Sequence, residues 1–205
     1  KILKKLNKIN FNTKLSILEE FKINLLNYKK DKKSDLKLKF VGEIELKKDI
    51  LFKEISFLEK DNKILISQLR LSNDHKIKDI EKIDMNYVDI ENLRNEIEIN
   101  KAGKDFLIRG SSFNINKILE NILDSDDKKK ELFQKDFKVN FDIDKIFLDK
   151  NHFIKDLNGY LLLNKNKIIE LNLASKFLNN KEIKLKIQKD GEKKITTLFS
   201  NEAKP

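Results

Sequence analysis

Apolar and polar residues alternate with a period of two over most of this chain. In the run 137–143 every second residue is apolar, and lysine, asparagine and aspartate stand between them. The same alternation occupies 9–17, 21–25, 36–40, 83–87, 97–99, 106–108 and 183–187. Side chains of a β-strand point alternately to opposite faces of its sheet. Each run therefore predicts a strand with one apolar face and one polar face.

Turn residues separate these predicted strands at short intervals. Asp190-Gly191 is the strongest hairpin signal, and the segment 101–104, with Gly103, predicts a second hairpin. Near Gly159 we expect the turn at 164–166, with the glycine inside a strand where the backbone bends or packs closely. In the N-terminal third we expect strands at about 7–17, 21–27, 35–47, 49–58 and 63–72.

The segment 114–123 has a different pattern. Its apolar residues fall at helical spacing, and Asn114 is a suitable N-cap, so we expect one short amphipathic helix there. The whole pattern predicts a mostly β fold: an extended, curved antiparallel sheet that forms a groove or half-barrel. A closed barrel and a sandwich are alternatives. Possible sub-units are 1–100, a strand meander, and 101–205, a hairpin followed by the helix and a five-strand meander.

The composition narrows the possible chemistry. The 205 residues include 44 Lys and Arg against 34 Asp and Glu, a net charge of +10, but basic residues are spread over every predicted strand. Binding of nucleic acid is therefore a weak alternative. The chain has no cysteine, and its two histidines, His75 and His152, stand in polar, turn-like contexts typical of the surface. No phosphate loop or nucleophile motif is present. We predict a protein that is not an enzyme and that binds no cofactor or metal.

What covers the apolar faces decides the function. Antiparallel sheets usually bury such a face against protein. One short helix is too little to cover many long one-sided strands. Two arrangements remain: two sheets that face each other, or a trough whose lining meets an apolar ligand.

A series of motifs in 104–205 follows the order of motifs in a known family. The segment 105–114, DFLIRGSSFN, is similar to a strand that ends in Gly-x-Ser-Phe-Asp before a short helix. A strand with one internal glycine at 157–161 and strands at 168–177 and 183–189 come next, and 200–203 is similar to an acidic turn. Asn114 replaces the usual Asp, and Lys204 stands where Gly is expected. On these motifs the chain resembles the AsmA-like family, most closely its YhdP-type branch.

The resemblance implies that the chain is a fragment of a larger β-groove protein. Such a protein is periplasmic, is tethered to the bacterial inner membrane by an N-terminal anchor outside this fragment, and conducts phospholipids between the inner and outer membranes. Its partners would be phospholipid acyl chains. We expect the groove face to contact lipid through nine apolar residues: Phe106, Ile108, Phe137, Val139, Phe141, Ile143, Ile183, Leu185 and Ile187. The alternative is a structural or adhesive β-repeat region of a bacterial surface protein, with a closed core.

Overall fold

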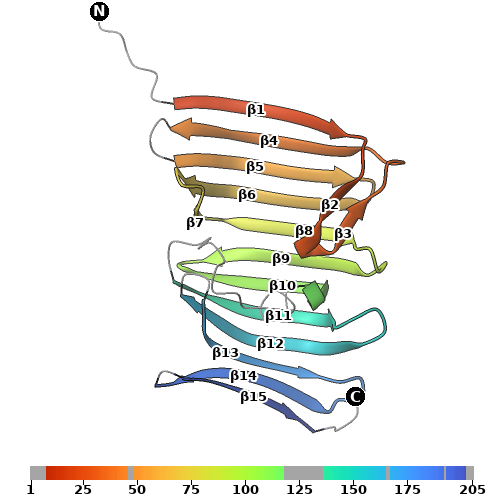
Figure 1. Ribbon diagram of the computed structural model, residues 1–205, viewed down its shortest axis with the longest axis vertical. Helices are drawn as coiled ribbons and strands as arrows, with labels where there is room; N and C mark the ends of the chain where they lie inside the picture. Colours follow the sequence, from red (N-terminus) through yellow and green to blue (C-terminus); the bar gives the residue numbers. More distant parts are fainter. Residues whose placement is uncertain (1–7, 46–48, 118–135, 165–166, 192, 202–205) are drawn as a thin grey trace, which may run out of the picture.

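A single large sheet organises the protein. The computed structural model describes residues 8–45, 49–117, 136–164, 167–191 and 193–201, and these form one 13-stranded sheet and a separate two-stranded hairpin (Figure 1). The strands of the large sheet are β1 (Lys8–Ile17), β4 (Leu36–Glu45), β5 (Asp49–Glu59), β6 (Asn62–Ser72), β7 (Ile77–Asp79), β8 (Lys82–Val88), β9 (Arg94–Ala102), β10 (Asp105–Asn114), β11 (Phe137–Phe147), β12 (Phe153–Asn164), β13 (Lys167–Lys176), β14 (Glu182–Asp190) and β15 (Lys193–Ser200).

The strands follow one another across the sheet almost in chain order. The order is β1-β4-β5-β6-β8-β9-β10-β11-β12-β13-β14-β15, and β7 pairs with β6 beside this path. The sheet is curved and is not closed into a barrel, so β1 and β15 are its edges. This confirms the predicted mostly β fold with an extended, curved antiparallel sheet.

The predicted turns are largely confirmed. Gly103 takes φ +68° between β9 and β10, and Asp190 pairs with Lys193 across the β14–β15 hairpin. Gly159 lies inside β12 at φ +130°, as expected for a glycine at a bend. Residues 165 and 166 of the predicted turn lie outside the described residues.

The predicted strand at 21–27 is wrong. The segment folds into β2 (Phe21–Ile23), a 3-10 turn, η1 (Asn24–Leu26), and β3 (Tyr28–Lys30). Asn27, in the left-handed region at φ 51°, ends the turn and lets the chain reverse. The two short strands pair antiparallel as a hairpin, the β2–β3 hairpin.

One pair of neighbours departs from the antiparallel pattern. β10 and β11 are parallel, with Phe106 opposite Val139 and Ile108 opposite Phe141. Parallel strands need a long crossover, which the segment 115–136 supplies. The first residue of this segment, Ile115, packs against buried side chains of the core. Residues 116 and 117 are helical, and the main-chain N–H of Asn116 donates to Asn114 Oδ1 at 3.1 Å. The rest of the predicted helix, 118–123, lies outside the described residues.

Irregularities in the ladders occur where apolar residues are three apart instead of two. Lys53 of β5, between Phe52 and Glu54, is unpaired, and the register against β4 shifts by one residue there. Opposite Lys53 in β6, Gln68 is also unpaired and has φ 53°. Asp144, between Ile143 and Ile146 of β11, is also unpaired, although the β11–β12 register does not shift there. One-residue shifts of register occur between β9 and β10 at Gly110/Ser112 and between β12 and β13 at Lys155/Asn158. An extra residue in a strand is a β-bulge, which increases the local twist and bend. The bulges let each strand keep its apolar residues on one face while the sheet curves.

The core is a row of side chains that crosses the sheet on its apolar face. Consecutive strands place one residue each opposite the next, and six of these side chains are at most 7% exposed. This buried row comprises Phe57, Ile64, Met85, Ile97, Ile143 and Leu157. In β10 its position is taken by Gly110, where a Cβ would lie 2.2 Å from the carbonyl oxygen of Glu96. Only glycine lets β9 and β10 approach this closely.

A buried polar network fixes the end of β10 where the crossover begins. The Asn114 amide nitrogen Nδ2 donates to Asp89 Oδ2 at 2.7 Å, and its main-chain N–H donates to Asn95 Oδ1 at 2.7 Å. Asp89 Oδ1 also accepts the main-chain N–H groups of Glu91 and Leu93. All three side chains of the network are at most 7% exposed, and each has partners, as buried polar groups require.

We expect Gly159→Ala to destabilise the fold far more than Gly103→Ala. Both glycines have positive φ: alanine costs about 1 to 2 kcal/mol at the left-handed φ of Gly103, and at least as much at φ +130°, a region essentially restricted to glycine. At position 159 a Cβ would also lie 2.0 Å from the carbonyl oxygen of Asn172, whereas at 103 it meets no atom within 4 Å. Urea unfolding should show a loss of at least about 3 kcal/mol for Gly159→Ala. Equal losses for the two variants would contradict the close packing of β12 on β13.

Candidate functional site

A second row of apolar side chains runs beside the buried row from one edge of the sheet to the other. Each of the twelve strands on the main path places one residue directly opposite the next, and ten of these residues are apolar. We call this row the apolar track; it consists of Thr13, Phe40, Ile55, Ile66, Ile83, Ile99, Ile108, Phe141, Gly159, Leu173, Leu185 and Leu198. With strands about 4.8 Å apart, the track is about 50 Å long.

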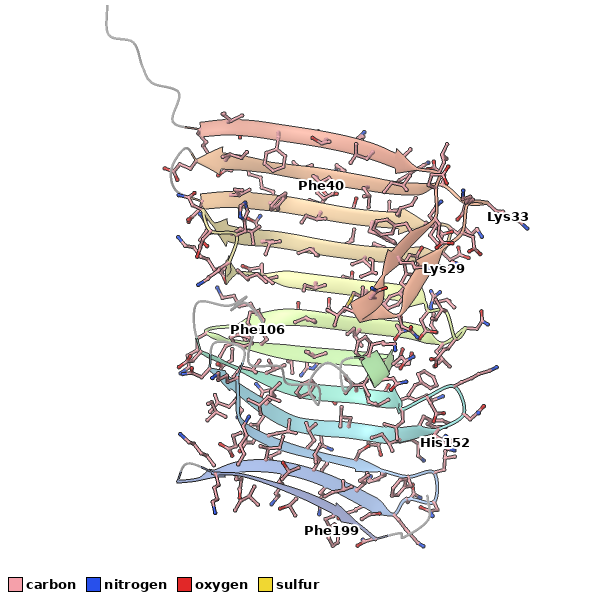
Figure 2. All side chains as sticks on the ribbon, viewed as in Figure 1. Lys29, Lys33, Phe40, Phe106, His152 and Phe199 are labelled. Atoms are coloured by element: carbon pink, nitrogen blue, oxygen red, sulfur yellow. The ribbon has the colours of Figure 1, made fainter. Side chains whose placement is uncertain are left out.

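The apolar track differs from the buried row in exposure. From Phe40 to Leu185 every residue of the track is partly exposed, whereas the side chains of the buried row are buried. Figure 2 shows Phe40 standing on the sheet among other side chains, away from the β2–β3 hairpin. Among the described residues, no second sheet lies over the track. An apolar surface of this length, continuous and half-exposed, is typical of a binding surface.

The opposite face of the sheet is polar and is crossed by ion pairs. Lys39 Nζ lies 3.0 Å from Glu54 Oε1, Arg109 lies 3.4 Å from Asp142, and Lys82 pairs with Glu98. These pairs are largely exposed and contribute little to stability. This face is therefore solvated, and the apolar face is the candidate site.

All nine predicted contact residues lie on the apolar face. Ile108, Phe141 and Leu185 belong to the track itself. A third row lies beside the track, on the side away from the buried row, and contains Phe106, Val139 and Ile187. In this row Leu161 and Leu171 stand between Val139 and Ile187, each directly opposite the next. Phe137 stands one position farther out, and Ile143 and Ile183 lie on the buried-row side. Phe137, Val139 and Ile143 are at most 8% exposed, so the other six offer more surface to a ligand.

The N-terminal half contributes as many residues to the track as the C-terminal half, and the sequence analysis did not name them as site residues. Phe40, Ile55, Ile66, Ile83 and Ile99 all belong to alternating or bulged runs. The signal was present in those runs. What was missing was the register that aligns one strand with the next, because it shifts by one residue between β4 and β5 at Val41/Gly42 and between β9 and β10 at Gly110/Ser112.

The β2–β3 hairpin covers the buried row at one end of the strands. In Figure 1 it lies across β5, β6 and β8 near that end. Its Tyr28 ring is 5.1 Å from the ring of Phe57 and 6.0 Å from that of Tyr87, both edge-on, and the Tyr87 hydroxyl donates to the carbonyl of Leu26 at 3.0 Å. The hairpin therefore closes one side of the apolar face and leaves the track open beside it.

Buried polar groups hold the hairpin in place. The Tyr28 hydroxyl donates to Glu59 Oε2 at 3.0 Å, and Asn62 Nδ2 donates to the same oxygen at 2.7 Å. Lys30, 1% exposed, donates from Nζ to the carbonyls of Leu18 and Glu19 at 2.9 and 2.8 Å. The Tyr28 bond joins the hairpin to the β5–β6 turn, and the Lys30 bonds join it to the chain just before it, so that the buried hydroxyl and ammonium groups are paired.

The same contacts shift two pKa values in opposite directions. Burial acts to raise the pKa of the Glu59 carboxyl, but hydrogen bonds from Ser34, Asn62 and Tyr28 outweigh it and lower that pKa below its usual range. Burial, and then the hydrogen bond to Glu59, raise the pKa of the Tyr28 hydroxyl. Glu59 is thus held as a carboxylate and Tyr28 as a neutral donor.

In the part of the chain that the structure describes, the two histidines do not lie on this face. His75 is exposed in the turn after β6, and His152 is exposed after β11, with its ring Nδ1 2.8 Å from Asp149 Oδ2 (Figure 2). Among the described residues no group of three or more His, Cys, Asp or Glu is placed to hold a metal ion. The described helices include none that is long and apolar enough to cross a membrane.

Comparison with known proteins gives no match: no family model, no curated protein and no solved structure corresponds to this chain. The site is therefore interpreted from its own geometry.

We expect Glu59→Gln to loosen the β2–β3 hairpin in a pH-dependent way. The folded pKa of Glu59 lies below its unfolded value of about 4.3. The stability from the carboxylate is therefore fully present above pH about 4.3 and is lost as the pH falls through the folded pKa. At pH 7 the variant should lose about 1.5 to 3 kcal/mol of unfolding free energy, the range for hydrogen bonds to a charged group.

Urea unfolding from pH 7 down to pH 3 measures this effect. The difference between wild type and Glu59→Gln should shrink as the pH falls. Glu54→Gln, which removes an exposed carboxylate of β5, is the matched control and should change stability by less than about 0.5 kcal/mol. A difference for Glu59→Gln that stays constant over this range would contradict the role of the ionised carboxylate.

Proposed function

We propose that this chain is a non-enzymatic segment of an AsmA-like envelope protein that binds or conducts phospholipids, with their acyl chains seated on the apolar track. The full protein would be periplasmic and tethered to the bacterial inner membrane, and lipid would pass between the inner and outer membranes. The observation that supports this most is the track: ten of its twelve residues, from Phe40 in β4 to Leu198 in the edge strand β15, are apolar, and nine of these are partly exposed and Leu198 is exposed.

The chemistry of the track suits a sliding ligand. Burial of apolar surface is worth about 25 cal/mol per Å² and has no directional requirement. Neighbouring positions of the track are Ile, Leu and Phe, so an acyl chain gains nearly the same free energy at each. A row without strong specific anchors holds a chain while allowing it to move along the sheet. The length of about 50 Å exceeds the roughly 30 Å of a bilayer's hydrocarbon core.

The alternative is a structural or adhesive β-repeat region with a closed core. The buried row and the β2–β3 hairpin favour it in part, because they form a protein-filled core along one side of the face. A scaffold of this kind needs its remaining apolar surface covered by protein as well. The half-exposed track is the feature on which the two functions differ.

We expect Phe141→Lys to reduce lipid occupancy strongly and Asp142→Lys to leave it unchanged. Both introduce the same side chain at neighbouring positions of β11, but Phe141 lies on the track and the Asp142 side chain is 67% exposed on the opposite face. Phe141→Lys removes the phenyl contact and places a charge on the apolar face. Lipid affinity should therefore fall roughly tenfold or more, a loss of at least about 1.4 kcal/mol of binding free energy. Native mass spectrometry of co-purified phospholipid is the measurement.

A second track variant distinguishes loss of lipid binding from a folding defect caused by Phe141→Lys. Leu185→Lys lies near the other edge of the sheet and should show the same loss, while circular dichroism and urea unfolding confirm that each variant is folded. Clean apo protein from wild type, or equal lipid occupancy in Phe141→Lys and Asp142→Lys, would favour the closed-core alternative.

A further inference from the structure

A small pocket opens beside the apolar track where the ends of β7, β9, β10 and β11 meet. Its volume is about 250 Å³. The lining has an apolar wall and a basic wall: the apolar wall consists of Ile77, Phe106 and Phe137, and the basic wall of Lys78, Lys101 and Lys104. Figure 2 shows Phe106 on this side of the sheet, away from the end covered by the β2–β3 hairpin.

The apolar wall of the pocket is continuous with the track. Phe106 lies two residues before Ile108 in β10, on the same face, and therefore about 7 Å from the track. The ring of Phe137 packs edge-on against that of Phe106, with centroids 5.2 Å apart. A ligand chain that lies on the track thus has an apolar path into the pocket.

The basic wall retains unused hydrogen-bond donors. Lys101 Nζ lies 2.6 Å from Asp79 Oδ1, and Lys78 Nζ lies 2.6 Å from Asp49 Oδ1. An ammonium group has three N–H donors, so a single carboxylate partner leaves others available. Lys104 is exposed in the β9–β10 turn and makes no ion pair within the described part of the chain.

The unpaired ammonium group of Lys104 is the charge of the lining that favours an anion. Asp79 is neutralised by Lys101, and Asp136 accepts a hydrogen bond from Asn164 Nδ2 at 2.9 Å. Lys78 is paired with Asp49 just outside the lining, so Lys104 is the lysine of the lining that has no ion-pair partner among the described residues. A phosphate suits such a site, because lysine binds it as a compact point charge.

We propose that this pocket binds the phosphate of a glycerophospholipid headgroup whose acyl chains lie on the apolar track. This inference rests on the proposed function and adds to it the chemical class of the ligand's polar end. Apolar burial holds the chains, and the lysines favour lipids with an anionic headgroup. The pocket lies outside the row of similar apolar positions, so a headgroup there marks one preferred resting place along the sheet.

The test compares two ligands with the same acyl chains, phosphatidylglycerol and diacylglycerol, which lacks the phosphate. Wild type, Lys104→Glu and Lys186→Glu are each incubated with vesicles that contain one of the two, and bound ligand is counted by native mass spectrometry. Lys186 is the matched control: it is exposed on the polar face of β14, far along the sheet from the pocket. Lys104→Glu should lower phosphatidylglycerol occupancy at least about fivefold and leave diacylglycerol occupancy unchanged, and Lys186→Glu should change neither.

The outcomes separate the two proposals. If Lys104→Glu and Lys186→Glu lower phosphatidylglycerol occupancy equally, or if Lys104→Glu lowers diacylglycerol occupancy as much, the headgroup site is wrong and the lipid-binding track stands. If wild type takes up neither ligand, the proposed function fails as well. Inorganic phosphate tests the other source of the same chemistry: it should bind at least tenfold more weakly than phosphatidylglycerol. Equal affinity would make the pocket a small-anion site and overturn the assignment to a lipid.

Discussion

The structure depends on a register that keeps the apolar side chains of twelve consecutive strands on one face. A shift of one residue between two neighbours would turn a whole strand's apolar set to the polar face. One-residue register shifts between β4 and β5, between β9 and β10 and between β12 and β13 absorb the extra residues without breaking this alignment. Both the buried row and the apolar track follow from this single constraint, since each is a line of directly opposed residues across the ladder.

Because most of the sheet forms a single layer, its stability comes from contacts between neighbouring strands and from the small core under the β2–β3 hairpin. The buried row supplies a core only one or two side chains wide, and the β2–β3 hairpin seals it through Tyr28, Phe57 and Tyr87. Each strand otherwise contacts only its neighbours, as in repeat proteins, where stability is a sum of nearest-neighbour terms. The buried contacts of Glu59 and Asn114 then fix the two places where the chain leaves the regular meander, the hairpin and the crossover.

The alternation of residues predicted the fold class, most strands and the shared face of all nine site residues, because the two-residue period is a direct consequence of strand geometry. It did not predict the β2–β3 hairpin, since Phe21, Ile23 and Leu25 continue the alternation through what is a turn. Nor did it predict that β10 and β11 are parallel, because pairing direction depends on the path of the connection 115–136 rather than on either strand. The pocket near Lys104 also depends on register and could not be found from a single segment.

The central claim is that the apolar track is covered by lipid rather than by protein. The most direct measurement is photo-crosslinking from single positions on the two faces of the same strands: Ile66 and Leu173 on the track, and their neighbours Ser67 and Asn172 on the polar face. A photoreactive residue at each position, activated in cells and analysed by mass spectrometry, reports what lies against it. The account predicts phospholipid adducts from positions 66 and 173 and none from 67 and 172. Adducts from the track to protein segments alone, or the same lipid yield from both faces, would contradict it.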